Sequence, residues 1–404
     1  MTSPPEGPFR IRSLTTSLYL PNFLFSVGRG VSVPVIALLA LELGASPAAA
    51  GVVVALRGVG TMAFDLPAGV LISRIGERRA MILAGLTLAG IGAAVWARPP
   101  LWLYAVLITL MGCTWSVWHI ARIAYAAGST TVNHRGRVMA LLGGFTRIGL
   151  LAGPLLGSLV VTGRGLADAF LVLTAVSGGA AVSMALARSA SFVPEQAPPG
   201  ERPTLVQVLS EHRHTLATAG AVAVAAQVLR SSREVLIPLW GDHIGIAAGT
   251  IPLIFAASYA LESLVFYPVG LLMDRKGRKW AAIPCIGLLS LGLAAIPLTG
   301  STVSLTAVAM LIGLANGLGS GMNMTLGSDL SPLAGRSRFL GVWRLVTDVG
   351  NVGGPMLVAA VTSAATLATA SVTVGAVGLV GLVLLWRTVP ETLVDARRSP
   401  ESRP

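Results

Sequence analysis

Charged residues are scarce in this chain of 404 residues, where Asp, Glu, Lys and Arg together make up 11%. Soluble domains average about 25% charged residues. The side chains that would cover a water-exposed surface are therefore missing, which excludes a soluble multi-domain enzyme and a disordered chain. Hydrophobic residues make up 54% and the mean hydropathy is +0.77. This composition predicts a protein whose solvent is lipid.

Cysteine is almost absent, and so are the sequence patterns of the common cofactor sites. The two cysteines, Cys113 and Cys285, both lie inside apolar segments, which excludes a disulfide framework and a zinc site. No Gly-x-x-x-x-Gly-Lys-Ser/Thr pattern occurs, so we do not expect ATP hydrolysis. We predict no cofactor, no metal and no enzymatic activity.

Long apolar segments fill most of the sequence. A helix spans a bilayer with about 20 mostly apolar residues, and twelve segments between Leu14 and Arg387 meet this length. We predict an all-α membrane protein with spanning helices at 14–41, 47–72, 80–97, 101–127, 138–162, 166–187, 216–241, 248–272, 280–299, 303–328, 339–363 and 367–387. The first segment contains Pro, Asn and Arg and lacks a small-residue cleavage site, so it reads as a spanning helix and not as a signal peptide.

A stretch rich in proline and charge at 188–214 predicts a linker between two six-helix halves. The predicted organisation is an N-terminal tail at 1–13, an N-terminal half at 14–187, the linker, a C-terminal half at 215–388 and a C-terminal tail at 389–404.

The net charge of +12 comes mainly from basic residues in alternate loops and in the C-terminal tail. The clusters are Arg74–Arg79, Arg135–Arg137, Arg275–Lys279, Arg336–Arg338 and Arg397–Arg398. Cytoplasmic loops accumulate Lys and Arg, so this pattern places both termini and the linker in the cytoplasm and does not indicate nucleic-acid binding. Only two of the 29 basic residues are lysine, which is typical of a GC-rich bacterial genome. We therefore expect a bacterial cytoplasmic membrane.

The two halves are sequence repeats with a constant offset of 201 residues. Pro67–Gly76 aligns with Pro268–Gly277, and the same offset aligns Arg135-Gly-Arg137 with Arg336-Ser-Arg338. It also aligns Gly149, Gly153 and Pro154 with their counterparts in the second half. Parallel repeats about an axis along the membrane normal build one large class of transporters.

The loop after the second apolar segment carries the run Gly69-Val-Leu71-Ile-Ser73-Arg74-Ile-Gly76-Glu77-Arg78-Arg79. It resembles the Gly-x-Leu-x-Asp-Arg-x-Gly-Arg-Arg signature of the major facilitator superfamily, with Ser73 in place of Asp. The resemblance implies a twelve-helix transporter in which this motif latches the cytoplasmic ends of the halves in the outward-facing state. The residues with this implied gating role are Gly69, Arg74, Gly76, Arg78 and, in the second copy, Gly270, Asp274, Arg275 and Gly277.

The fifth apolar segment contains Gly149, Gly153, Pro154, Gly157 and Ser158. This spacing resembles the Gly-x-x-x-Gly-Pro-x-x-Gly-Gly pattern that marks antiporters and drug exporters of the same superfamily. Small residues four apart also form a smooth strip for helix packing, so two readings remain open, export and packing alone.

Eleven charged residues lie inside the predicted spans. Each costs roughly 2.5–3.5 kcal/mol at the centre of a bilayer on insertion scales, so each needs a partner or a wet cavity. They are Arg29, Arg57, Arg122, Arg147, Arg230, Arg233, Arg344, Asp65, Glu234, Glu262 and Asp348. Their balance of +3 predicts an anionic or zwitterionic substrate.

The resemblance implies that the first, fourth, seventh and tenth helices line the transport cavity. The candidate substrate-binding residues are Asn22, Arg29, Trp115, His119, Arg122, Gln227, Arg230, Asn316 and Asn323. Arg29 and Arg230 are equivalent under the offset of 201, and we expect both to face the cavity. The same offset pairs Arg147 with Asp348, which we expect to form a salt bridge between the halves.

Three alternatives for these charges stay open. Arg122 lies near a helix end, where its side chain can snorkel to the interface. Arg230 and Glu234 are spaced to form an i, i+4 pair, and Glu262 is a possible partner of Arg233.

Proton coupling needs a carboxylate that is reachable from both sides in turn, and the candidates are Asp65, Glu234 and Glu262. We therefore expect a monomeric secondary transporter that exports small amphipathic compounds by alternating access, driven by proton influx. A flippase or exporter of an anionic lipid or lipid-linked glycolipid, and a transporter of an anionic metabolite, are the alternatives. A membrane enzyme or a sensor would need extramembrane segments that this sequence lacks.

Overall fold

The computed structural model describes residues 14–130, 132–187, 207, 210–332, 336–389 and 391. For residues 132, 133, 274 and 336–338 it describes the backbone alone. The predicted N-terminal tail and most of the predicted linker and C-terminal tail lie outside the described residues, and so does the side chain of Asp274.

The described part of the chain is helical, and each predicted span corresponds to one helix or to one pair of helices. The helices of the first half are η2 (Thr15–Tyr19), α1 (Leu20–Glu42), α2 (Pro47–Ile75), α3 (Glu77–Trp96), α4 (Leu101–Gly128), α5 (Val132–Gly163) and α6 (Ala169–Leu186). Those of the second half are α8 (Arg213–His243), α9 (Ile251–Lys276), α10 (Lys279–Ala295), η3 (Ile296–Leu298), α11 (Thr302–Leu318), α12 (Met322–Asp329), α13 (Arg336–Ala364) and α14 (Leu367–Thr388).

Eleven segments of the described chain are long and apolar enough to cross a membrane, and they include every predicted span except α8. That helix has 31 residues, so its length is ample. Three charged residues, Arg230, Arg233 and Glu234, lower its mean hydropathy. Arg233 and Glu234 are buried in the bundle, and Arg230 is hydrogen-bonded to a backbone carbonyl at the end of α11.

The predicted helix at 303–328 is wrong in one respect, because it is broken into α11 and α12. The break falls at Gly319-Ser320-Gly321, where Gly321 has a φ of +80°. Glycine adopts this left-handed conformation without a steric penalty, so the run of glycines at 317–321 is the sequence signal for the break.

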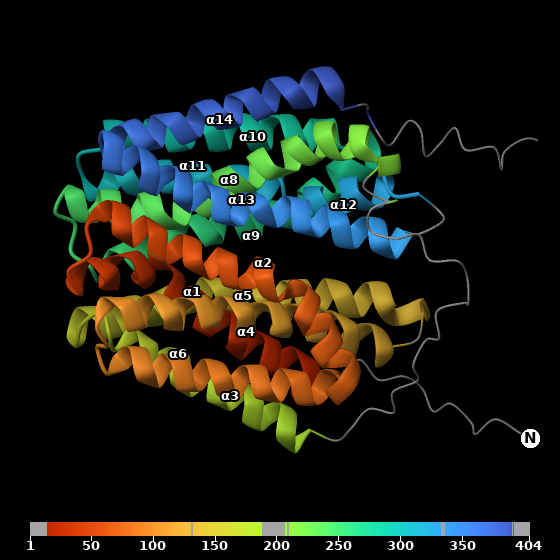
Figure 1. Ribbon diagram of the computed structural model, residues 1–404, viewed down its shortest axis with the longest axis horizontal. Coiled ribbons are helices and arrows are strands. Elements are labelled where there is room, and N and C mark those ends of the chain that lie inside the picture. Colours follow the sequence, from red (N-terminus) through yellow and green to blue (C-terminus); the bar gives the residue numbers. More distant parts are fainter. Residues whose placement is uncertain are drawn as a thin grey trace, which may run out of the picture.

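The helices pack in two groups that repeat the same neighbour relations (Figure 1). In the view, α1–α6 occupy the lower half and α8–α14 the upper half. In the first group α1 packs on α5, α2 on α4, and α3 on α6. In the second, α8 packs on α13, α9 on α11, and α10 on α14. The packing therefore follows the offset of 201 residues, and α2 against α13 and α5 against α9 form the main contacts between the groups.

Glycines on α5 and α13 allow equivalent close approaches in the two halves. A Cβ atom on Gly153 would lie 2.4 Å from the Val27 carbonyl oxygen of α1, and one on Gly354 would lie 2.6 Å from the Val228 carbonyl oxygen of α8. Gly149 meets α1 in the same way, whereas Gly157 has only ordinary contacts. The packing role of this motif is thus present in the structure, and it is present in both halves.

The glycines of the loop motif fall into two pairs with different surroundings. Gly76 and Gly277 end α2 and α9 with φ values of +83° and +110°, so each makes the turn into the next helix. Gly69 and Gly270 allow no close helix approach, because a Cβ atom on either would meet nothing within 4 Å.

The turns at Gly76 and Gly277 lie at the end of the bundle that carries Arg74, Arg78 and Arg275, which we call the basic end. Arg78 donates hydrogen bonds to the carbonyl oxygens of Met184, Ala185 and Ala187, at the end of α6 in its own half. Arg74 and Arg275 are exposed.

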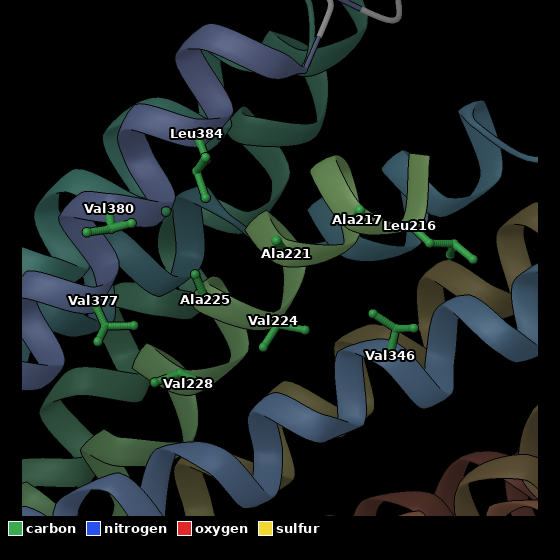
Figure 2. Close-up of a pocket in the computed structure, with 11 residues that line it drawn as sticks. Leu216, Ala217, Ala221, Val224, Ala225, Val228, Val346, Val377, Val380 and Leu384 are labelled. Atoms are coloured by element: carbon green, nitrogen blue, oxygen red, sulfur yellow. The ribbon is translucent and has the colours of Figure 1, made fainter. Parts of the chain in front are cut away.

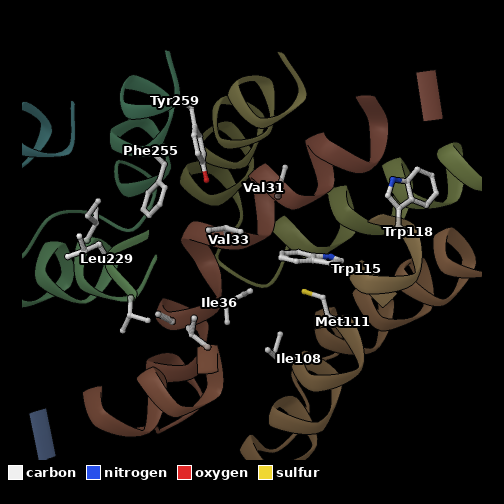
Figure 3. Packing of buried hydrophobic residues seen from close by; sticks show 14 of the residues in the cluster. Val31, Val33, Ile36, Ile108, Met111, Trp115, Trp118, Leu229, Phe255 and Tyr259 are labelled. Atoms are coloured by element: carbon white, nitrogen blue, oxygen red, sulfur yellow. The ribbon is translucent and has the colours of Figure 1, made fainter. Parts of the chain in front are cut away.

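At the opposite end the two halves are in direct contact. The Ser158 hydroxyl of α5 donates to the Gly249 carbonyl oxygen, just before α9, over 2.7 Å. Deeper in the bundle, Val33, Ile36, Ile108 and Met111 form a buried apolar layer (Figure 3). At this end a cavity of about 560 Å³ also lies between the halves, with Leu41, Asp242 and Thr366 among its lining residues.

A valine at Gly112 should destabilise the protein. A Cβ atom there would lie 2.0 Å from the Arg57 carbonyl oxygen, so α4 and α2 would have to separate. We expect Gly112→Val to cost about 1–3 kcal/mol, as overpacking does, and to lower the thermal unfolding midpoint of the purified protein in detergent. Gly90→Val is the matched control, because a Cβ atom there meets nothing within 4 Å. Equal midpoints for the two variants would contradict the close approach.

Candidate functional site

A cavity of about 580 Å³ lies between the two halves. It is lined by residues of α1, α2 and α4 from the first half and of α12 and α13 from the second. The lining residues are Arg29, Arg57, Gly58, Thr61, Trp115, Ser116, His119, Ile123, Asn323, Met324, Ser328, Leu340, Trp343, Arg344, Thr347, Asp348 and Asn351. On α4, α12 and α13 these residues run from mid-helix toward the basic end, so the cavity reaches that end and stops at the apolar layer described above.

Four of the nine predicted substrate-binding residues line this cavity, namely Arg29, Trp115, His119 and Asn323. The other five, Asn22, Arg122, Gln227, Arg230 and Asn316, are not among the lining residues. The expectation that the seventh helix lines the cavity is wrong, because α8 contributes none of the lining residues that the structure describes. The polar wall comes instead from α2 and α13.

Arg29 is the exposed cation of the cavity. It is the one exposed residue in the run from Pro21 to Ala40 of α1. Its guanidinium lies 4.9 Å from the centre of the Trp115 ring, an arrangement that stabilises a cation over an aromatic face. Among the described residues, its guanidinium has no hydrogen-bond or ion-pair partner. A positive charge in a membrane cavity without an acidic partner is a candidate site for an anionic ligand.

Arg230 does not face the cavity, and the expected symmetry with Arg29 fails here. Its guanidinium donates to the Gly319 carbonyl oxygen over 2.7 Å and lies 3.9 Å from the Cys285 sulfur. Gly319 is the C-cap of α11, so Arg230 satisfies a carbonyl at the negative end of a broken helix. The first half has no equivalent break, because α4 is continuous, and Arg29 therefore has no such partner.

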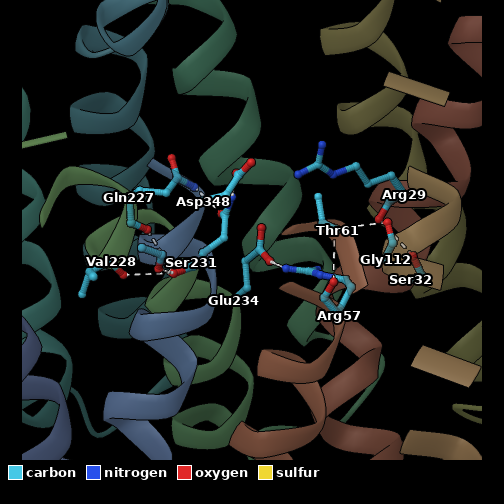
Figure 4. A network of polar contacts seen from close by, with 12 residues as sticks. Arg29, Ser32, Arg57, Thr61, Gly112, Gln227, Val228, Ser231, Glu234 and Asp348 are labelled. Atoms are coloured by element: carbon cyan, nitrogen blue, oxygen red, sulfur yellow. Dashed lines mark hydrogen bonds and ion pairs between the residues drawn. The ribbon is translucent and has the colours of Figure 1, made fainter. Parts of the chain in front are cut away.

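Two buried ion pairs cross from α2 to the second half. Arg57 binds Glu234 of α8 (Figure 4). Asp65 accepts two hydrogen bonds from Arg344 of α13, each 2.9 Å long, and a third from the Ser116 hydroxyl. Two of the three predicted proton-coupling acids are thus bound to arginines of the other half.

The alternative pairing of Arg230 with Glu234 is not formed, because Glu234 binds Arg57 and Arg230 binds the helix break. The alternative pairing of Arg233 with Glu262 is formed, at 3.2 Å. That pair joins α8 to α9 within one half, and Glu262 does not line the cavity.

The expected salt bridge between Arg147 and Asp348 is not formed in this structure. The Arg147 guanidinium lies 3.5 Å from the centre of the Phe266 ring and donates to the Ser320 hydroxyl over 3.0 Å. Arg147 therefore contacts α9 and the break between α11 and α12, whereas Asp348 faces the cavity.

Arg122 belongs to a hydrogen-bonded network inside the first half and does not snorkel. It donates to the Asn22 side chain and to the Thr146 hydroxyl, and it lies 3.1 Å from His119 Nδ1. Asn22 in turn donates to Thr146 over 2.9 Å. In the second half, Gln227 donates to Asn351 of α13, and Asn316 is buried with its Oδ1 unpaired among the described groups.

Sequence reasoning did not assign Arg57, Thr61, Arg344 and Asn351 to the site. The signal was present, because Arg57, Thr61 and Asp65 form one polar stripe on α2 and Arg344, Asp348 and Asn351 form another on α13. The expectation that other helices line the cavity kept these stripes out of the predicted site.

A second cavity of about 500 Å³ lies between α8, α13 and α14 (Figure 2). Its lining consists of Leu, Val, Ala and Gly side chains, including Ala221, Val346 and Val377. None of its lining residues carries a charge or a side-chain hydrogen-bonding group, so it lacks the means to orient a polar ligand. The cavity at the opposite end, lined by Leu41, Asp242 and Thr366 among others, includes no arginine. The central cavity joins charged, aromatic and apolar groups from both halves and is the candidate substrate site.

The comparisons with known proteins agree with this arrangement. Uncharacterized proteins of Mycobacterium bovis and Mycobacterium tuberculosis are 24% identical over 354 residues, which cover 84% of this chain and 83% of theirs.

Solved transporters share the fold. The nucleoside transporter NupG has a TM-score of 0.76 at 13% identity, covering 92% of this chain and 99% of its own. A bacterial homolog of the human lysosomal transporter Spinster, in an inward-facing and unoccupied conformation, has a TM-score of 0.73 at 13% identity, with coverages of 97% and 98%. A D-xylose-proton symporter has a TM-score of 0.72 at 16% identity, with coverages of 95% and 98%.

The sequence itself matches the family model of the Major Facilitator Superfamily over residues 18–236 and 222–404. Together with two repeated six-helix groups around a central cavity, this match shows that the chain belongs to the Major Facilitator Superfamily.

Proposed function

We propose that this protein is a secondary active transporter that exports small amphipathic anionic or zwitterionic compounds across the cytoplasmic membrane, in exchange for protons. The observation that carries the proposal is Arg29, a cation exposed in the central cavity over the Trp115 ring, with no acidic partner among the described residues. An arginine in this position supplies charge and several hydrogen-bond donors to a carboxylate or phosphate.

The remaining lining supports an amphipathic ligand. Ile123, Met324 and Leu340 offer apolar surface, while Thr61 and Asn351 offer hydrogen-bonding groups. The volume of about 580 Å³ lies inside the range of about 300–1,000 Å³ that is usual for small-molecule sites.

The direction of transport rests on the glycine motif of α5. The cavity reaches the basic end, which basic loops mark as cytoplasmic, and importers and exporters both pass through such an inward-facing state. The glycine motif of α5 resembles that of exporters in the superfamily. It also packs α5 on α1, and transport measurements have to separate these two roles.

Proton coupling is supported by the carboxylates at the contact between the halves. Asp65 and Glu234 each bind an arginine of the opposite half, so a proton on either acid would weaken a contact that holds the halves together. One of the structural neighbours is a proton symporter, which is a property of that protein and gives this part of the proposal a precedent within the fold.

Arg29→Gln should reduce the affinity for anionic ligands by roughly 10- to 100-fold, the equivalent of about 1.5–3 kcal/mol for hydrogen bonds to a charged group. The measurement is a thermal-shift and binding panel of anionic, zwitterionic and cationic amphiphiles and anionic lipids on the purified protein. Arg164→Gln is the matched control, because Arg164 is an exposed residue at the opposite end. A panel in which only cationic compounds bind would overturn the anionic assignment.

Proton exchange should be visible in proteoliposomes. For an anionic compound identified in the panel, we expect substrate movement in one direction to drive proton movement in the other, and dissipation of the pH gradient to abolish accumulation. Liposomes that contain Arg29→Gln should show neither flux. Substrate accumulation that is indifferent to the pH gradient would refute proton exchange and leave the binding site in place.

A further inference from the structure

Arg344 lies between two carboxylates, one from each half of the protein. Its guanidinium binds Asp65 of α2 through two hydrogen bonds of 2.9 Å. Its Nε also lies 3.7 Å from Asp348 Oδ2, one helical turn further along α13. Arg344 and Asp348 both line the central cavity.

The two carboxylates are satisfied to very different extents. Asp65 accepts both hydrogen bonds from Arg344 and another from Ser116. Asp348 accepts one hydrogen bond at Oδ1 from the Asn351 amide over 2.7 Å. Its Oδ2 is buried and accepts no hydrogen bond from the described groups, since 3.7 Å is beyond hydrogen-bonding distance.

An ionised carboxylate in this position is costly. A buried charged oxygen without a hydrogen-bond donor loses its hydration, and in return it gains only the attraction of Arg344, which lies 3.7 Å away and gives its hydrogen bonds to Asp65. Asp65 and Asp348 also share the one guanidinium of Arg344, at 2.9 Å and 3.7 Å from its Nε. Two carboxylates that share one arginine repel each other when both are ionised, which favours a proton on the one that has fewer hydrogen bonds.

We propose that Asp348 is a proton-binding site, and that its proton determines whether Arg344 remains bound to Asp65 across the two halves. The inference rests on the proposed proton exchange and names the residue that carries it. In the protonated state, the Asp348 carboxyl is neutral and does not compete for the guanidinium, which stays with Asp65. The proton arrives from water in the cavity, which Asp348 lines, and returns there.

Loss of the proton changes the partner of Arg344. Ionised Asp348 competes with Asp65 for the guanidinium, and the two residues are four apart on α13, the spacing at which helical side chains meet. The exchange therefore needs only side-chain rotation. The bridge from α13 to α2 becomes a contact within α13, and the halves are released from each other at this point.

Among the described carboxylates around the cavity, Asp348 shares its arginine with Asp65 and receives no hydrogen bond from it. From α2, Arg57 faces the cavity and is bound to Glu234 of α8. Arg29 of α1 and His119 of α4 line the same cavity. The lining residues from α12 do not titrate, and the charge of α14 is confined to Arg387 near the basic end.

The site can be tested directly by infrared difference spectroscopy of the purified protein as a function of pH. We expect a protonated-carboxyl stretching band that titrates in the wild-type protein and is lost in Asp348→Asn. Glu262→Gln is the matched control, because Glu262 is bound by Arg233, and it should retain the band. Should Asp348→Asn fail to fold, Asp348→Glu keeps the carboxyl group and is expected to shift the band and not remove it.

The outcomes separate this inference from the proposed function. A band that persists unchanged in Asp348→Asn, while proton-driven transport is present in the wild type, would overturn the assignment of Asp348 and leave proton exchange to another acid. A band that disappears in Asp348→Asn, in a protein whose transport is indifferent to pH gradients, would support the proton site and refute proton-driven export.

Discussion

The structure depends on one constraint, that a charge buried in a bilayer has no water to hydrate it and needs a partner inside the protein. The arginines within the spanning helices meet it in different ways. Arg57 and Arg344 bind acids across the contact between the halves, whereas Arg233 binds an acid within its own half. Arg230 binds a backbone carbonyl at a helix break. Arg29 differs from these arginines, because its guanidinium has no acid or carbonyl partner among the described residues and faces the cavity and the Trp115 ring.

The two ion pairs between the halves have a mechanical consequence. Transporters of this class work by rocking one half against the other around a fixed site, so the contacts between the halves have to break and re-form within the cycle. A permanent apolar seal around the cavity would oppose this motion. Ion pairs that line or border a wet cavity are suited to it, because water, a proton or a ligand can replace either partner. Arg57–Glu234 and Asp65–Arg344 occupy this position, in a conformation whose central cavity reaches the basic end.

Much of the fold follows from the sequence, because the number of spans, their approximate bounds and the repeat offset are local or periodic properties. The paired positions Gly153 and Gly354 illustrate this, since both make the same close approach in their own half. The break at Gly319-Ser320-Gly321 was less accessible, because an apolar run with glycines is also compatible with a continuous helix.

The partners of the charged residues could not be predicted to the same extent. Helical spacing indicates which side chains share a face, and it correctly grouped Arg57 with Asp65. It carries no information about which face meets which across the bundle, so the pairing of Glu234 with Arg57 was missed. The offset of 201 suggested equal roles for Arg29 and Arg230, and the helix break in one half alone makes their roles different.

The most direct test of this account is an experimental structure of the protein with a bound anionic amphiphile. The pairing of the other spanning arginines predicts that the anionic group lies within hydrogen-bonding distance of Arg29, beside Trp115, while Arg230 remains on the Gly319 carbonyl oxygen. Density for the anionic group at Arg230, or outside the central cavity, would contradict the account.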